Sequence, residues 1–380
     1  MNPTVNITVA NGNLGRTFQT QDGICAMVLT GDTVGLLNTP YRITSVANAI
    51  DQGITEALEP FAYKHLVEFY AEAGDGAVLY LLLRAETVTM AQMVDYAHAS
   101  SARAILDFAT EAVCLLGVAR NPTGEASVPA NFVRADVIAA ITGSTTMISN
   151  YRNKYKPFRL LIEGRTDVTS NVPQDLKAMT NNGASVVLGG TANDGHASVG
   201  LALGRLARIP VQRCIGRVKD GALPITEAFI GATAVEGFSN LETAIGKGYI
   251  TLKNYVGRTG YYFSDDPTTS LPTDDFTNLA NGRVIDKAYK LSYQVYLDEI
   301  NNEVPINEDG TIPAEVCKFL EGKIEQTIRQ AMAGEISSFN AFVDPQQNVL
   351  ATGQVNISEN IIPVGYSKII AITLGFENPF

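Results

Sequence analysis

The sequence has few of the residues from which catalytic and metal centres are built. Its 380 residues include only three histidines and four cysteines. No two cysteines form a Cys-x-x-Cys pair, and no histidine lies in an HExxH motif or at metal-ligand spacing from a cysteine or another histidine. Widely separated cysteines are typical of reduced, mostly buried thiols in a cytosolic protein. We therefore predict no metal site.

Long apolar runs and an excess of positive charge are also missing. The best apolar run, residues 77–83, falls far short of the roughly 20 residues that cross a bilayer. No apolar segment precedes Arg16, the first basic residue, so we expect no secretory signal. The formal net charge is -11, from 39 acidic and 28 basic side chains. This balance argues against nucleic acid as a partner and against direct membrane insertion.

With 46% hydrophobic and 18% charged residues, the composition is that of a folded, soluble chain, and the length predicts two or three domains.

The charge is unevenly distributed along the sequence. Residues 1–100 carry a balance of -6, residues 101–219 one of +6, and residues 220–380 one of -11. Patches of opposite sign would favour head-to-tail self-association, whereas segments that interleave in the fold would cancel them.

Between about residues 22 and 220, short apolar runs alternate with helical stretches. This alternation predicts an α/β domain with a largely parallel sheet over residues 19–248. The expected buried strands cover residues 24–29, 77–83, 112–119, 158–163 and 185–188. The expected helices cover residues 45–58, 63–71, 130–155 and 196–206.

The pattern changes after residue 248. A strand pair is expected at 249–255 and 260–263, followed by a long helix over 277–300. A second long helix starts at Pro313, which suits the first turn of a helix. Strands at 337–344 and 349–357 complete a predicted α+β module over residues 249–357.

Both ends of the chain have the alternating pattern of a half-buried strand. Residues 1–18 and 358–380 are therefore interpreted as terminal arms, with flexible segments at 11–15 and 358–365. The strands are expected at 4–10 and 366–376. Their apolar faces consist of Val5, Ile7 and Val9 in the first, and Ile370, Ile372, Leu374 and Phe376 in the second.

A glycine-rich loop offers the best candidate for enzyme chemistry. Residues 188–196 (LGGTANDGH) lie between an expected strand and an expected helix, where backbone N–H groups can bind phosphate. The glycine spacing fits neither GxGxxG nor a Walker A motif, so a turn and helix cap is the preferred interpretation. The pairs Asp265-Asp266 and Asp274-Asp275 lie among turn residues and favour solvated carboxylates over an acid–base pair. We predict no catalytic residue and no cofactor. An α/β nucleotide-binding enzyme that uses Gly189 to His196 remains the alternative.

The C-terminal third carries a family resemblance. The residues that carry it are 260–267 (GYYFSDDP), 274–276 (DDF), 281–288 (NGRVIDKA), Pro305, 329–332 (RQAM), 362–363 and 374–376. Over residues 249–380 the chain resembles the sheath subunit of contractile phage tails and contractile injection systems, most closely a sheath-like family of Bacteroidetes-type bacteria. Over residues 20–248 the resemblance is architectural.

The resemblance implies a structural protein and not an enzyme. Such a subunit assembles as hexameric rings or a helical array around an inner tube protein, with a baseplate and a tail terminator as further partners. The cylinder shortens and drives the tube through a target envelope. The resemblance also implies an α/β outer domain, an α+β core and arms that exchange strands with neighbours. It places assembly in the bacterial cytoplasm and the mature protein in a virion tail or injection particle.

The two-faced termini support strand exchange independently, because a strand added to an open sheet edge gains backbone hydrogen bonds and fills side-chain pockets. The other possibility is that both strands pair within their own subunit. One of the two long helices is expected to face the tube, with Lys318, Glu321 and Glu325 as candidate contacts. Another self-assembling tail component is a further alternative, although a tube protein is normally a smaller β-barrel.

Overall fold

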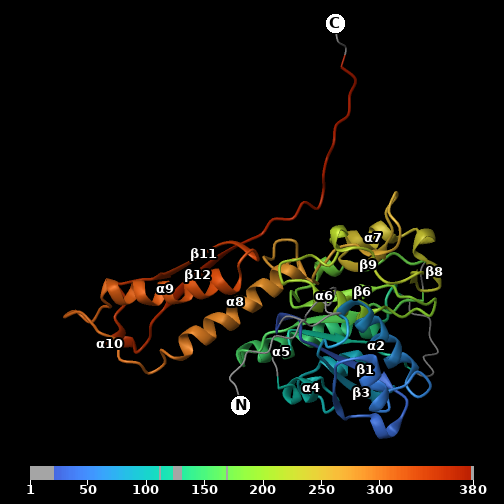
Figure 1. Ribbon diagram of the computed structural model, residues 1–380, viewed down its shortest axis with the longest axis horizontal. Coiled ribbons are helices and arrows are strands. Elements are labelled where there is room, and N and C mark those ends of the chain that lie inside the picture. The colour runs from blue at the N-terminus through green and yellow to red at the C-terminus, as the bar shows by residue number, and fades with distance from the viewer. Residues whose placement is uncertain (1–20, 111–112, 123–130, 168–169, 378–380) are drawn as a thin grey trace, which may run out of the picture. The chain divides into compact units, whose positions relative to one another are not determined.

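The computed structural model describes residues 21–110, 113–122, 131–167 and 170–377 (Figure 1). The chain divides into two compact units, Met1–Lys290 and Leu291–Phe380. The strand expected at residues 4–10, with Val5, Ile7 and Val9, lies outside the described residues. No helix in the described part of the chain is both long and apolar enough to cross a membrane.

The first unit is built around an eight-stranded sheet with the order β10-β9-β6-β5-β4-β1-β3-β2. Its six central strands run parallel, and the two edge strands run antiparallel to their neighbours. The parallel strands are β1 (Cys25–Gly31), β3 (Leu79–Ala85), β4 (Leu115–Val118), β5 (Arg159–Glu163), β6 (Ala184–Leu188) and β9 (Tyr249–Lys253); the edges are β2 (Pro40–Ile43) and β10 (Tyr262–Phe263). β7 (Phe229–Ile230) and β8 (Thr233–Ala234) form a separate small hairpin.

Helices cover this sheet. Every residue of β1, β4, β5 and β6 is buried, which requires cover on both faces. On α6, Gly200 allows a close approach to α2, because a Cβ there would lie 2.2 Å from the carbonyl oxygen of His65. The helices of this unit are α1 (Val46–Asp51), α2 (Pro60–Ala73), α3 (Met90–Val94), α4 (Arg103–Phe108), α5 (Ala135–Asn153), α6 (Val199–Arg208) and α7 (Leu241–Gly246). The predicted α/β architecture with a largely parallel sheet is confirmed.

The second unit contains a helix packed on a β-hairpin. Helix α8 (Leu279–Leu297) starts in the first unit and ends in the second, where α9 (Ala314–Ala331) follows. β11 (Ile336–Val343) and β12 (Ile357–Pro363) form the antiparallel hairpin, and the short helix α10 (Val349–Thr352) lies between them in the sequence. In β11, the alternate side chains of Phe339, Ala341 and Val343 are buried, and Val343 shares a small core with Cys317 and Leu320 of α9.

Two expectations about this region differ from the structure. The boundary expected at residue 249 lies inside the first unit, because β9 pairs in parallel with β6 and carries β10 with it. The strand predicted at 349–357 is wrong. Residues Val349–Thr352 are helical, and Gly353, with φ of 65°, ends this helix in the left-handed conformation.

The C-terminal arm also starts later than predicted. Residues 358–363 belong to β12 and pair with β11, so they are not a flexible segment. The expected strand at 366–376 is not a strand in the single chain, since residues 364–377 form neither helix nor strand. We call residues 364–377 the C-terminal segment.

Candidate intersubunit interface

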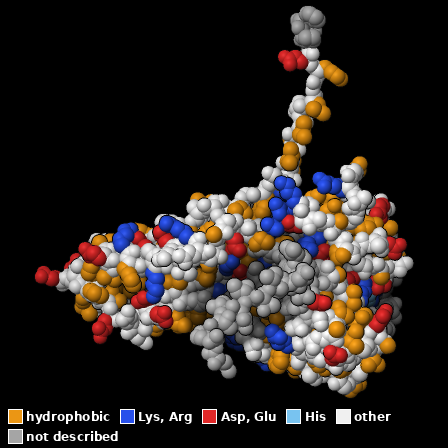
Figure 2. All heavy atoms as spheres, viewed as in Figure 1, with side chains coloured by type: hydrophobic (Ala, Val, Ile, Leu, Met, Phe, Trp, Pro, Cys, Tyr) orange, Lys and Arg blue, Asp and Glu red, His pale blue; other side chains and the backbone are white. Residues whose placement is uncertain are grey.

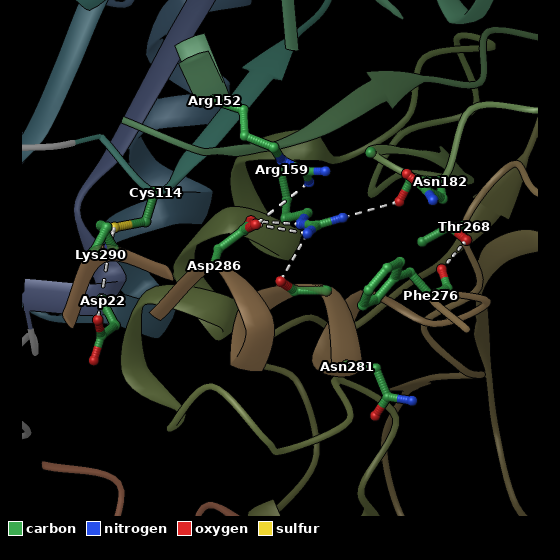
Figure 3. A network of polar contacts seen from close by, with 12 residues as sticks. Asp22, Cys114, Arg152, Arg159, Asn182, Thr268, Phe276, Asn281, Asp286 and Lys290 are labelled. Atoms are coloured by element: carbon green, nitrogen blue, oxygen red, sulfur yellow. Dashed lines mark hydrogen bonds and ion pairs between the residues drawn. The ribbon is translucent and has the colours of Figure 1, made fainter. Parts of the chain in front are cut away.

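A buried arginine fixes the first half of α8 to the sheet of the first unit (Figure 3). Arg159 begins β5 and is fully buried. Its Nε and Nη2 donate to the two carboxylate oxygens of Asp286 at 2.6 and 2.7 Å, and Nη2 also donates to the Gly282 carbonyl at 2.8 Å. Gly282 leaves room for this guanidinium, because a Cβ there would lie 2.6 Å from the guanidinium carbon. This is the bidentate geometry in which arginine binds a carboxylate most strongly.

Neighbouring positions of α8 extend this network. Lys287 forms an ion pair with Asp22 at 2.9 Å, and Lys290 Nζ lies 3.1 Å from the Cys114 sulfur. Burial raises the pKa of the Cys114 thiol, although the Lys290 ammonium opposes the shift. The sequence NGRVIDKA, on which the family resemblance partly depends, is therefore a buried structural motif that fastens α8 to the first unit.

In the second unit, carboxylates of α9 bind the outer edge of β11. The N–H groups of Val343 and Ala341 donate to Glu321 Oε1 at 2.9 Å and Glu325 Oε1 at 3.2 Å. Although burial raises the pKa of the Glu321 carboxyl, the Lys318 ammonium and the Val343 N–H outweigh it and hold this pKa below its usual value. These carboxylates therefore bind backbone N–H groups of the hairpin in their own chain.

The three residues that were expected to face the tube differ in their exposure to solvent. Glu321 is buried and Glu325 is half-buried, whereas the Lys318 side chain is 76% exposed. Only Lys318 remains a candidate surface contact. Sequence reasoning missed the capping role of the glutamates. One sequence feature could have predicted this role. Each glutamate directly follows a residue of the buried stripe of α9, Leu320 or Ile324.

The C-terminal segment exposes apolar side chains to solvent. Ile370, Ile372 and Leu374 are 77%, 75% and 91% exposed, and Phe376 is fully exposed. Figure 1 shows this segment as an extended trace beyond β12, and Figure 2 shows apolar side chains along it. Large apolar side chains grouped in this way mark an interaction surface. Among the described residues, no strand pairs with this segment.

The glycine-rich loop after β6 packs tightly against the backbone of its own chain. A Cβ at Gly190 would lie 2.5 Å from the His196 carbonyl oxygen, and one at Gly195 would lie 2.8 Å from that of Thr166. These glycines are thus required by packing within the fold. His196 Nδ1 lies 2.8 Å from Glu163 Oε1, and Glu163 also accepts the Arg120 N–H. This arrangement supports a packed turn over a phosphate cradle, although Ser198, the N-cap residue of α6, makes no side-chain cap hydrogen bond.

The acidic pairs considered for acid–base chemistry also have structural partners. Asp266 is buried, and its Oδ2 accepts the N–H of Ala280 at the start of α8 at 2.9 Å. Asp274 accepts hydrogen bonds from the Asn182 amide and the Phe276 N–H. The two carboxylates thus have structural roles: Asp266 binds the start of α8, and Asp274 binds Asn182 and Phe276.

Comparisons with known proteins cover the whole chain. The family described as DUF2586, N-terminal domain, matches residues 2–267, and DUF2586, C-terminal domain, matches residues 275–380. No curated protein sequence gives a significant match. Among solved structures, the contracted sheath complex of the extracellular contractile injection system PVC superimposes with a TM-score of 0.66 at 12% identity, covering 99% of this chain and 98% of the other.

Two further structures show the same similarity. The contracted helical sheath of the anti-feeding prophage has a TM-score of 0.62 at 14% identity, with 99% of each chain covered. The sheath tail protein Lin1278 from Listeria innocua has a TM-score of 0.52 at 11% identity, with 92% of this chain and 96% of that chain covered. At these identities the similarity establishes the fold, which is that of contractile tail sheath proteins.

Proposed function

The chain belongs to the DUF2586 family, and from its fold we propose that it is the sheath subunit of a contractile tail or injection particle. In this role it is a structural protein that assembles with copies of itself into a cylinder around an inner tube. Contraction of the cylinder drives the tube through a target envelope.

The exposed C-terminal segment supports this proposal most strongly. Its apolar residues alternate as in a strand, and in the described part of the chain no strand pairs with it. A neighbouring subunit supplies the missing sheet. Each backbone hydrogen bond of a donated strand contributes roughly 0.5–1.5 kcal/mol net, and each fully buried apolar side chain adds ~1.5–3 kcal/mol. One donated strand is then a durable link between subunits.

The mechanism we propose is a rearrangement of the contacts between subunits of the cylinder. The extended cylinder is metastable and is held by contacts of the sheath with the tube and with itself. During contraction the outer α/β parts form more contacts, while the donated strands keep neighbouring subunits connected. The free energy comes from these contacts and not from nucleotide hydrolysis.

The partners follow from this role. They are other copies of the chain in rings or a helical array, an inner tube protein, a baseplate and a tail terminator. Lys318 is our surface candidate for a contact with the tube, because its side chain is exposed. We place assembly in the bacterial cytoplasm and the mature protein in the tail or injection particle.

Negative-stain electron microscopy of the purified full-length protein tests the proposal. We expect hollow cylinders with a cogwheel-like end view. A variant that lacks residues 366–380 is the control, and we expect it to stay folded but not to form cylinders. Monodisperse particles at every protein concentration would refute the sheath role. Cylinders formed by the truncated variant would refute strand donation by this segment.

A further inference from the structure

A lysine amine and a cysteine sulfur lie in direct contact where α8 passes the sheet of the first unit. Lys290 Nζ is 3.1 Å from the Cys114 sulfur, and Figure 3 shows the sulfur turned towards Lys290. The two residues are 176 positions apart in the sequence. In the described part of the chain, none of the other three cysteines accepts a hydrogen bond from a lysine; these are Cys25, Cys214 and Cys317.

Separate contacts hold each of the two groups in place. Cys114 directly precedes β4, and its N–H donates to the Ile24 carbonyl while its own carbonyl accepts the Arg159 N–H, both at 2.9 Å. Lys290 lies one turn beyond Asp286, the carboxylate that Arg159 binds. Two reactive groups that the fold already holds together lose little further freedom when a bond joins them.

The charge of Lys290 favours the reactive form of the thiol. The thiolate, and not the thiol, is the nucleophile in cysteine chemistry. Burial raises the pKa of the Cys114 thiol, and the Lys290 ammonium opposes this shift through its charge and its hydrogen bond. At Cys214 the carboxylates of Asp265 and Asp266 add to the effect of burial and raise the thiol pKa further. Cys114 therefore has an activating neighbour where Cys214 has deactivating ones.

A small cavity adjoins the pair. Its volume is about 10 Å³, and its walls include Asp22, Cys114 and Lys290. A space of roughly 10–15 Å³ holds one water molecule, so an oxygen atom fits beside the two side chains. The Lys290 side chain is 17% exposed, which gives small solutes a route to the pair.

We propose that peroxide joins Cys114 and Lys290 covalently through one oxygen atom, as an S–O–N bridge. One thiol, one neutral amine and two molecules of hydrogen peroxide give the bridge and three molecules of water. The S–H bond, the N–H bonds that supply one hydrogen, and both O–O bonds break, while an S–O and an N–O bond form. Sulfur and nitrogen are each oxidised by two electrons, and the peroxides are reduced. Peroxide first converts the thiolate to a sulfenic acid, and the lysine proton passes to solvent.

The geometry favours an inserted oxygen over a direct S–N bond. A direct bond requires the two atoms to approach much further than their present 3.1 Å, whereas an oxygen between them leaves α8 close to its position. Reducing systems of a cytoplasm keep such oxidised thiols from accumulating. In an oxidising exterior the bridge would fasten Lys290, the last residue of the first unit, to the start of β4. This chemistry does not depend on the proposed sheath role.

Peptide mass spectrometry of the full-length protein tests the proposal. The protein is treated with hydrogen peroxide, alkylated and digested with trypsin. We expect a linked pair of peptides that contain Cys114 and Lys290, heavier than their sum by one oxygen atom less two hydrogen atoms, without cleavage after Lys290. Dithiothreitol should separate the pair. An unmodified Cys114, or a Cys114 that carries oxygen without a link to Lys290, would overturn the proposal. A pair lighter by two hydrogen atoms would show a direct S–N bond and overturn the inserted oxygen.

Two lysine variants serve as matched controls. Lys290→Arg keeps the positive charge but has no primary amine, so we expect no link. Lys287→Arg changes the neighbouring lysine, which forms an ion pair with Asp22, and should leave the link intact. Circular dichroism checks that both variants are folded. A link to Cys114 that persists in Lys290→Arg would overturn the assignment of the amine.

Amide exchange tests whether the bridge fastens the helix. In the peroxide-treated protein we expect the amides of the α8 turn around Lys290 to exchange about tenfold more slowly than in the reduced protein, because local opening of this turn is restricted. Dithiothreitol should restore the faster exchange. Equal exchange before and after formation of the bridge would overturn this role.

Discussion

At the scale of single residues, the most consequential contact is the buried pair of Arg159 and Asp286. Removing one partner of such a pair leaves an uncompensated buried charge, which costs far more than the loss of a surface ion pair. The pair connects β5 of the sheet to α8, the helix that continues into the second unit.

Asp286→Asn is expected to lower the free energy of unfolding by about 3–5 kcal/mol, because the Arg159 guanidinium stays buried without a counter-charge. Denaturant unfolding of the unassembled chain measures the change. Arg217→Ala is the control, since Arg217 forms a partly exposed ion pair with Asp220 and should change stability by less than about 1 kcal/mol. Equal effects of the two variants would contradict the role of the Arg159 contact.

His65 is expected to make the first unit sensitive to acid. Burial lowers the pKa of its imidazole to about 3. The unfolded chain therefore binds a proton below about pH 6.5 that the folded chain does not bind, and stability falls as the pH drops from 6.5 towards 3. Between pH 7 and pH 5 the loss should be about 2 kcal/mol. Unfolding curves of His65→Gln should show a smaller loss over this range, and an identical loss would contradict the assignment.

At the scale of elements, the sequence predicts the parallel strands of the first unit well. Strands such as β1, β3 and β5 are short apolar runs that are buried on both faces, so their signal is local. The edge strand β2 was missed, because its residues Pro40–Ile43 are mostly half-buried or exposed. The strand placed at 349–357 was wrong, since a left-handed turn at Gly353 ends a short helix there.

The candidate interface was only partly predictable. The alternation in residues 366–376 identifies a two-faced segment, but it does not show whether the partner strand lies in the same chain. The capping of β11 by Glu321 and Glu325 depends on how α9 packs on the hairpin. Contacts of this kind join residues about 16–22 positions apart in the sequence and leave no periodic signal.

Polar substitutions on one face of the C-terminal segment should prevent assembly without affecting the fold. We expect Ile370→Ser/Ile372→Ser/Leu374→Ser to unfold within about 0.5 kcal/mol of the unchanged chain, because these side chains are exposed in the single subunit. Electron microscopy should show no cylinders. The control, Ala371→Ser/Thr373→Ser, alters the opposite face and should assemble. Normal cylinders from the triple variant would contradict burial of this face.

At the scale of the whole molecule, the charge is concentrated in the smaller unit. Residues 291–380 contain 12 acidic and 4 basic side chains, a balance of -8, whereas residues 1–290 carry 27 acidic and 24 basic side chains, a balance of -3. The basic middle third of the sequence forms β4, β5 and β6, which lie together in the centre of the sheet. A balance of this sign would oppose contacts between the second units of two copies.

Salt is accordingly expected to promote self-assembly. The Debye length falls from about 30 Å at 0.01 M to about 8 Å at 0.15 M ionic strength, which screens repulsion between like-charged subunits. Light scattering of the purified protein should show faster cylinder growth at the higher ionic strength. Slower growth at the higher ionic strength would mean that attraction between patches of opposite sign dominates.

Amide hydrogen exchange of residues 366–376, compared between the unassembled chain and the cylinder, tests strand donation most directly. We predict fast exchange in the single subunit, where these residues form no strand, and strong protection at alternate amides in the cylinder, where one edge of the donated strand is paired. Protection of this segment already in the single subunit, or fast exchange in the intact cylinder, would contradict the account.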